Sequence, residues 1–128
     1  MRKVKFKGLS NCNSEWTYGN LVIVGNDYHI TGQEECEEIS DYTLVTKSSV
    51  GQFTGLYDID GSKDGNEIYE GDIVYLESID KQAVVTFEKD YCCFCFRLDR
   101  GDIDFNTYSV SKENIENLKV KVIGNINI

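Results

Sequence analysis

The stretch of sequence that decides the fold is Val50 to Val74, VGQFTGLYDIDGSKDGNEIYEGDIV. Its two ends are rich in β-forming residues, and its centre is acidic and glycine-rich. The tripeptide Glu70-Gly71-Asp72 is typical of a turn, after which Ile73 begins an apolar run that enters a core as a strand. The stretch therefore predicts a strand that follows an acidic, glycine-rich loop.

Segments with strand character continue on both sides of this stretch. β-branched and aromatic residues crowd them, and Gly, Asn and Asp separate them. The expected strands are Val4 to Lys7, Trp16 to Val24, Asp41 to Val45, Ile73 to Ser78, Ala83 to Glu88, Tyr91 to Leu98 and Lys119 to Ile126. Short helices are expected at Gln33 to Ile39 and at Lys112 to Leu118, the second with Ser111 as its N-cap and Glu113 in its first turn. The predicted fold is mainly β, with one or two short helices, in a small SH3-like or barrel-like architecture.

Two of these strands, Ala83 to Glu88 and Tyr91 to Leu98, predict a hairpin whose turn is Lys89-Asp90. Alternation divides the second strand into two faces. The face expected in the core carries Cys92, Phe94, Phe96 and Leu98, and the opposite face carries Tyr91, Cys93, Cys95 and Arg97. No Cys-x-x-Cys spacing or nearby histidine completes a zinc site, so we interpret these cysteines as small apolar residues of a strand.

Length and composition indicate a globular protein of ordinary size. The 128 residues predict one domain over 1–128, within which 1–49 and 50–128 are candidate sub-layers. The formal net charge of -9 would repel a nucleic-acid backbone. No segment has the roughly 20 apolar residues of a membrane helix, and the start MRKVKFKG lacks the apolar region of a secretory signal. Together with an odd set of five cysteines, these features predict a cytoplasmic protein that binds neither nucleic acid nor membrane directly.

The residue types for catalysis are sparse in this chain. The single histidine, His29, has no companion serine or cysteine motif, so we interpret it as structural. No residue is assigned a catalytic or cofactor-binding role. A hydrolase that uses only carboxylates is the enzymatic alternative.

The acidic loop resembles the first half of a calcium-binding loop. Asp60, Ser62 and Asp64 stand at alternate positions before Gly65, as ligands do in an EF-hand. The second half differs, because Gly71 stands where the bidentate glutamate is needed. No metal is therefore assigned, and Asp60, Ser62 and Asp64 remain the calcium candidate against the alternative of a solvated acidic turn.

The same central stretch also resembles a known family. Residues 50–56 (VGQFTGL) and 65–74 (GNEIYEGDIV) are similar to the central signature of the YopX family, whose members are small proteins encoded mainly by bacteriophages and prophages. Lys5 to Gly8, Trp16 to Leu21 and Val122 to Ile126 are similar to its ends. The resemblance implies a β-rich fold, a phage or prophage origin in a bacterial cytoplasm, a tendency to form homo-oligomers, and no established enzymatic activity.

We therefore expect a non-enzymatic binding module that acts on a host or phage macromolecule, with a host or phage protein as its partner. Residues 58 to 72 hold six acidic side chains and one lysine, which suit a basic partner surface. The partner-binding candidates are Asp58, Asp60, Asp64, Glu67, Glu70 and Asp72. One alternative is an acidic DNA mimic that inhibits a host defence or transcription protein. The other is an oligomeric sensor or sponge for a small ligand, in which the backbone of Gly51, Gly55 and Gly71 lines the pocket.

Overall fold

The computed structural model describes residues 4–32, 42–59, 66–98 and 107–128. The chain divides into two compact units, residues 1–53 and residues 54–128. The strand β5 (Gly51–Tyr57) begins in the first unit and ends in the second. The prediction of a mainly β fold is confirmed, because two antiparallel sheets, one α-helix and two short 3₁₀ helices, η2 (Lys47–Ser49) and η3 (Glu77–Ile79), make up the regular structure of these residues.

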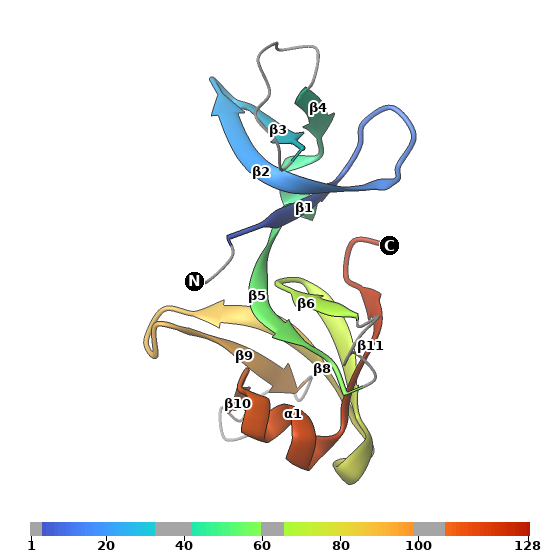
Figure 1. The fold of residues 1–128 in the computed structure, drawn as a ribbon, viewed down its shortest axis with the longest axis vertical. Helices are drawn as coiled ribbons and strands as arrows, with labels where there is room; N and C mark the ends of the chain where they lie inside the picture. Colours follow the sequence, from blue (N-terminus) through green and yellow to red (C-terminus); the bar gives the residue numbers. More distant parts are fainter. Residues whose placement is uncertain (1–3, 33–41, 60–65, 99–106) are drawn as a thin grey trace. The chain divides into compact units, whose positions relative to one another are not determined.

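The first unit is an antiparallel sheet in the order β4-β3-β2-β1-β5 (Figure 1). Its strands are β1 (Phe6–Leu9), β2 (Trp16–Val24), β3 (Asp27–Thr31), β4 (Tyr42–Val45) and the start of β5. One isolated bridge, between Ser10 and Val45, links β4 to the end of β1. Because this link is one bridge and not a ladder, the described strands form no closed barrel, and the barrel-like part of the expectation gives way to an open sheet.

Two glycines allow the strands of this unit to approach one another. A Cβ atom on Gly19 would lie 1.7 Å from the carbonyl oxygen of Thr31, and the φ angle of Gly19 is +155°. A Cβ atom on Gly8 would lie 2.9 Å from a methyl group of Val45. Val45 and Ile30 are buried, so both glycines are placed where a side chain would push the sheet away from its small core.

The second unit contains the end of β5 paired with β6, a five-stranded sheet in the order β10-β9-β8-β7-β11, and one helix. Its elements are β6 (Glu67–Tyr69), β7 (Asp72–Leu76), β8 (Lys81–Glu88), β9 (Cys93–Leu98), β10 (Thr107–Ser109), α1 (Lys112–Leu118) and β11 (Val120–Asn125). The core packs residues of this sheet, among them Val74 and Phe96, against Ile68 of β6 and against Ile115 and Leu118 of α1. Burial of this apolar surface is the main force that holds the unit together.

The helix α1 confirms the prediction made for Lys112 to Leu118. Ser111 is its N-cap, and the Ser111 hydroxyl accepts a hydrogen bond from the backbone N–H of Asn114 at 3.1 Å. The Asn114 side chain also donates to the carbonyl oxygen of Ser109 at 2.8 Å, so the helix begins directly beside β10. The helix expected at Gln33 to Ile39 lies outside the described residues. Within the described ranges, no helix has the length and apolar character to cross a membrane.

The predicted hairpin is also present, as β8 and β9, but its turn differs from the expectation. The last pair of the ladder is Glu88 with Cys93, so the turn has four residues, Lys89 to Cys92, and not the two expected. Cys92 has a φ angle of +51° and is exposed. The expectation that Cys92 lies on the core face of a strand is therefore wrong, because the residue belongs to the turn.

Candidate functional site

The carboxylate of Asp72, one of the partner-binding candidates, is buried inside the second unit. Its side chain is 1% exposed. One oxygen accepts a hydrogen bond from the backbone N–H of Tyr69 at 2.8 Å, and the other accepts one from the side-chain amide of Asn125 at 3.0 Å. Asp72 thus closes the turn between β6 and β7 and ties it to the end of β11. This burial removes Asp72 from the acidic surface that the sequence suggested.

Gly71, beside Asp72, provides the turn with its backbone conformation. Its φ angle of +92° lies in the region that favours glycine. Its N–H donates to the carbonyl oxygen of Val85 at 2.8 Å, and its own carbonyl oxygen accepts from the N–H of Ile126 at 3.0 Å. Both polar groups of the Gly71 backbone are therefore hydrogen-bonded within the fold. The hypothesis of a small-ligand pocket had placed this backbone in contact with the ligand.

Asp58, a second partner-binding candidate, is also buried, at 4% exposure. Its Oδ2 atom accepts hydrogen bonds from the backbone N–H of Val122 at 2.9 Å and from the side-chain amide of Asn66 at 3.1 Å. The backbone N–H of Asp58 also donates to the carbonyl oxygen of Asn66 at 3.0 Å. Asp58 therefore joins the end of β5 to the beginning of β6 and to β11. Its Oδ1 atom is buried and has no hydrogen-bond partner within the described structure.

The remaining acidic candidates are divided between half-buried positions and undescribed ones. Glu67 and Glu70 are half-buried, and Glu67 accepts a hydrogen bond from the hydroxyl of Tyr69 at 2.9 Å. Asp60 and Asp64 lie outside the described residues, and so does Ser62 of the calcium candidate. Among the residues that the structure does describe, no group of three or more His, Cys, Asp or Glu side chains is arranged to hold a metal ion.

His29 lies on β3 between aliphatic neighbours. Its cross-strand partners are Val22 and Leu44, and its ring lies 6.2 Å from the ring of Tyr42, tilted by 54°. The Nδ1 atom is buried and has no hydrogen-bond partner in the described part of the chain. Of these three neighbours two are aliphatic and one is a tyrosine, and none of them is a carboxylate.

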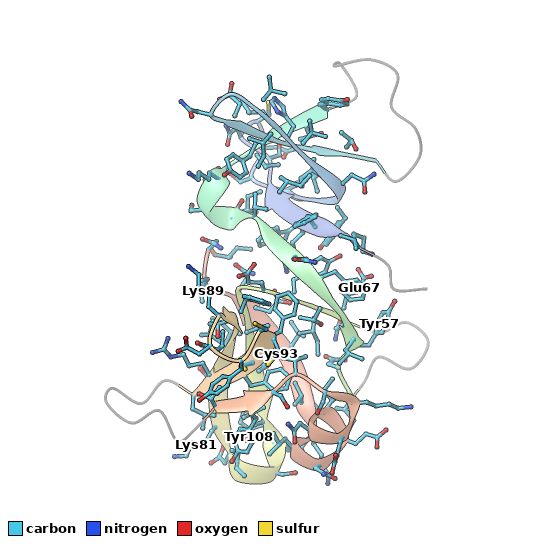
Figure 2. The ribbon with its side chains drawn as sticks, turned by 90° about the vertical axis from the view of Figure 1, so that its left-hand side faces the viewer. Tyr57, Glu67, Lys81, Lys89, Cys93 and Tyr108 are labelled. Carbon is cyan, nitrogen blue, oxygen red and sulfur yellow. The ribbon has the colours of Figure 1, made fainter. Side chains whose placement is uncertain are left out.

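The two cysteines of β9, Cys93 and Cys95, lie in contact. Figure 2 labels Cys93, the first residue of β9, and Lys89 of the turn before it. The Sγ atoms of Cys93 and Cys95 are 3.7 Å apart. Burial and then the contact with Cys93 raise the pKa of the Cys95 thiol to about 11. Cys92 is apart from this pair, because its thiol contacts the carbonyl oxygen of Lys89 in the turn.

A comparison with protein families shows which family the chain is related to. The model of the family described as YopX protein matches residues 2–127. The chain belongs to the YopX family. A search of the curated proteins finds no match. The YopX match extends over both units, and the signature residues that suggested it form β5, β6 and β7 and the turn at Gly71.

One surface feature of this YopX-family protein was missed by the sequence reasoning. The tip of the β8–β9 hairpin exposes two aromatic side chains, Tyr91 at 69% and Phe87 at 45%. The Phe87 ring meets the ring of Phe94 edge-on, with centroids 5.3 Å apart and an interplanar angle of 77°. The sequence signal that could have found the tip is the charged tripeptide Glu88-Lys89-Asp90, which has an aromatic residue on each side, Phe87 and Tyr91.

Proposed function

We propose that this YopX-family protein is a non-enzymatic binding module, encoded by a bacteriophage or prophage, that binds a host or phage protein in the bacterial cytoplasm. The observation that carries the proposal is the pair of exposed aromatic side chains, Phe87 and Tyr91, at the tip of the β8–β9 hairpin. Tyrosine and other large aromatic residues supply much of the binding energy of protein interfaces, because they bury a large area at a low cost in conformational entropy.

The geometry of the hairpin supports this role. Phe87 and Phe94 are cross-strand partners, and their edge-to-face contact restrains the exposed Phe87 ring before any partner binds. The turn is held by hydrogen bonds from the N–H of Tyr91 to the carbonyl oxygen of Glu88 at 3.2 Å and from the N–H of Cys92 to that of Lys89 at 3.3 Å. A tip that is already ordered loses less entropy on binding than a flexible loop.

The acidic stretch gives less support to the alternative of a DNA mimic. Of its six acidic residues, Asp58 and Asp72 are buried and use their carboxylates inside the second unit. A mimic of a nucleic-acid backbone needs its charges at the surface, so these two carboxylates do not add to such a surface. The alternative of a small-ligand sensor also receives less support, because the N–H and carbonyl groups of Gly71 are already hydrogen-bonded within the fold.

The test is a comparative affinity purification from infected bacteria. Tagged full-length protein is compared with a Phe87→Ser/Tyr91→Ser variant and with Ile128→Ser, a control that removes an apolar side chain that is 83% exposed and lies outside the hairpin. We expect at least one protein partner to be retained by the wild type and the control and to be lost from the hairpin variant. The same set of co-purifying proteins in all three samples would contradict the proposed role of the tip.

A further inference from the structure

Cys93 and Cys95 form a thiol pair on one face of β9. Their side chains point to the same side of the strand because they are two residues apart, and their Sγ atoms are 3.7 Å apart. Across the ladder Cys93 pairs with Glu88, and Cys95 pairs with Thr86 and Ser109. This face is therefore polar around the two thiols, whereas Phe96 of the same strand points into the apolar core.

The two thiols differ in their access to solvent. Cys93 is half-buried at the beginning of β9, beside the turn, whereas Cys95 is only 2% exposed. A dissolved reagent can therefore reach Cys93 first. Cys95 needs no access of its own to react with a group attached to Cys93, because the two sulfur atoms are already in contact.

We propose that Cys93 and Cys95 are a reversible redox dithiol that closes to an intrachain disulfide by exchange with a low-molecular-weight disulfide such as oxidised glutathione. In the first step the Cys93 thiolate attacks one sulfur of the small disulfide, a mixed disulfide forms, and the first small thiol leaves. In the second step the Cys95 thiolate attacks the Cys93 sulfur, the protein disulfide forms, and the second small thiol leaves. Two protein thiols are oxidised, one small disulfide is reduced to two thiols, and the two protons pass to the leaving thiolates.

The order of these steps agrees with the chemistry of the buried thiol. Burial is the largest cause that raises the pKa of Cys95, and the hydrogen bond and charge interaction with Cys93 raise it further. Once Cys93 is in a mixed disulfide, its thiol can no longer contribute to that rise. The reduced protein thus holds Cys95 mainly as the thiol, and the reaction of Cys93 removes one cause of its raised pKa while burial remains.

The geometry of the strand makes the disulfide easy to reduce. Residues two apart on an extended strand have Cα atoms about 6.6 to 6.8 Å apart, at the upper end of the roughly 4.4 to 6.8 Å that disulfides span. Closing the bond therefore contracts β9 between its partners β8 and β10. A strained disulfide has a more oxidising potential than a structural one, so we expect reduced glutathione to reopen this bond.

The test uses full-length protein with Cys92→Ser, because the tryptic peptide Asp90 to Arg97 then contains only Cys93 and Cys95. The protein is incubated with oxidised glutathione, quenched with N-ethylmaleimide in denaturing urea, where both thiols are accessible, digested and analysed by mass spectrometry. We expect the peptide to lose two hydrogen atoms, to carry neither maleimide nor glutathione, and to regain two alkylatable thiols after treatment with reduced glutathione. A peptide that keeps both thiols free, or that retains glutathione, would overturn the proposal.

Two further variants test the order of attack in the same background. With Cys95→Ser added, we expect Cys93 to retain one glutathionyl group, because nothing resolves the mixed disulfide. With Cys93→Ser added instead, we expect Cys95 to stay unmodified over the same time. Equal modification of Cys93 and Cys95 in these variants would contradict the assigned roles. If the Cys95→Ser protein does not fold, as judged by circular dichroism, the experiment on the parent Cys92→Ser protein still decides the proposal.

Discussion

Asp72→Ala is expected to destabilise the second unit strongly. The substitution removes the acceptor of two hydrogen bonds, and the backbone N–H of Tyr69 and the amide of Asn125 lose their partner in a site where Asp72 is only 1% exposed. A buried donor left without an acceptor costs about 1 to 3 kcal/mol, so two of them cost about 2 to 6 kcal/mol. This loss is a large fraction of the roughly 5 to 15 kcal/mol that stabilises an ordinary domain.

The assay is urea unfolding of the full-length protein followed by far-UV circular dichroism. With a slope of about 1 kcal/mol per molar urea, the midpoint of the transition that reports the second unit should fall by about 2 M or more. Asp72→Asn keeps one acceptor oxygen and should give an intermediate loss. The single tryptophan, Trp16, lies in the first unit, and its fluorescence reports whether that unit is disturbed as well.

Asp90→Ala is the matched control, because it removes an exposed carboxylate from the turn between β8 and β9. Its effect should stay within about 0.5 kcal/mol. If Asp72→Ala unfolds at the same urea concentration as Asp90→Ala, the two hydrogen bonds of Asp72 do not hold the β6–β7 turn in solution, and the reasoning is refuted.

Three other predictions follow from the same structure. Because the pKa of Cys95 is raised to about 11, its thiolate is scarce at pH 8. Maleimide at this pH should therefore label the exposed Cys12 and leave Cys95 of the folded protein unlabelled. Equal labelling of Cys12 and Cys95 in a peptide map would contradict this. Gly19→Ala places a Cβ 1.7 Å from a backbone oxygen of β3 and should lower the free energy of unfolding by about 3 kcal/mol. Gly25→Ala, at a position with φ +62° and open space around it, should lower it by about 1 kcal/mol. Tryptophan fluorescence in urea measures both losses, and equal losses would refute the close approach at Gly19. Ser111→Ala removes the N-cap of α1 and should cost about 1 kcal/mol in the transition followed by circular dichroism, and an unchanged midpoint would show that the cap is not needed.

The features that could be predicted from the sequence depend on neighbouring residues. The helix α1 was predicted with its bounds because Ser111 and Glu113 mark its beginning within the helix itself. The strand β2 was predicted with its bounds because six of its nine residues are β-branched or aromatic. Local patterns are sufficient where the residues that decide the conformation lie within one turn or one strand.

The prediction missed β3, β5, β6 and β10, which are short or are interrupted by glycine or polar residues. The strand β6 has three residues, Glu67–Tyr69, and β10 has three, Thr107–Ser109. The strand β3, Asp27–Thr31, begins with an acid and contains His29, so its residues do not alternate clearly. These segments become strands because a neighbouring strand pairs with them, and pairing of this kind has no signature in the segment itself.

The prediction of the hairpin turn was wrong for a related reason. The sequence places Lys89-Asp90 between two apolar runs, which suggests a two-residue turn. Lys-Asp is not one of the pairs, such as Asn-Gly, that two-residue turns favour, and the structure instead uses four residues with Cys92 at φ +51°. The longer turn moves Cys92 out of the strand and leaves Cys93 and Cys95 as the pair in contact.

The sequence by itself determined that this chain is mainly β, where its helix begins, and that it belongs with the YopX family, because strand propensity, capping and signature residues are local properties. Only the tertiary structure decided the direction of the acidic side chains in the central stretch. Asp72 meets Asn125 across 53 residues of chain, and Asp58 meets Val122 across 64. Contacts between such distant residues leave no pattern in the local sequence. Asp58 and Asp72 were therefore predicted as partner-binding residues, although the fold buries both carboxylates.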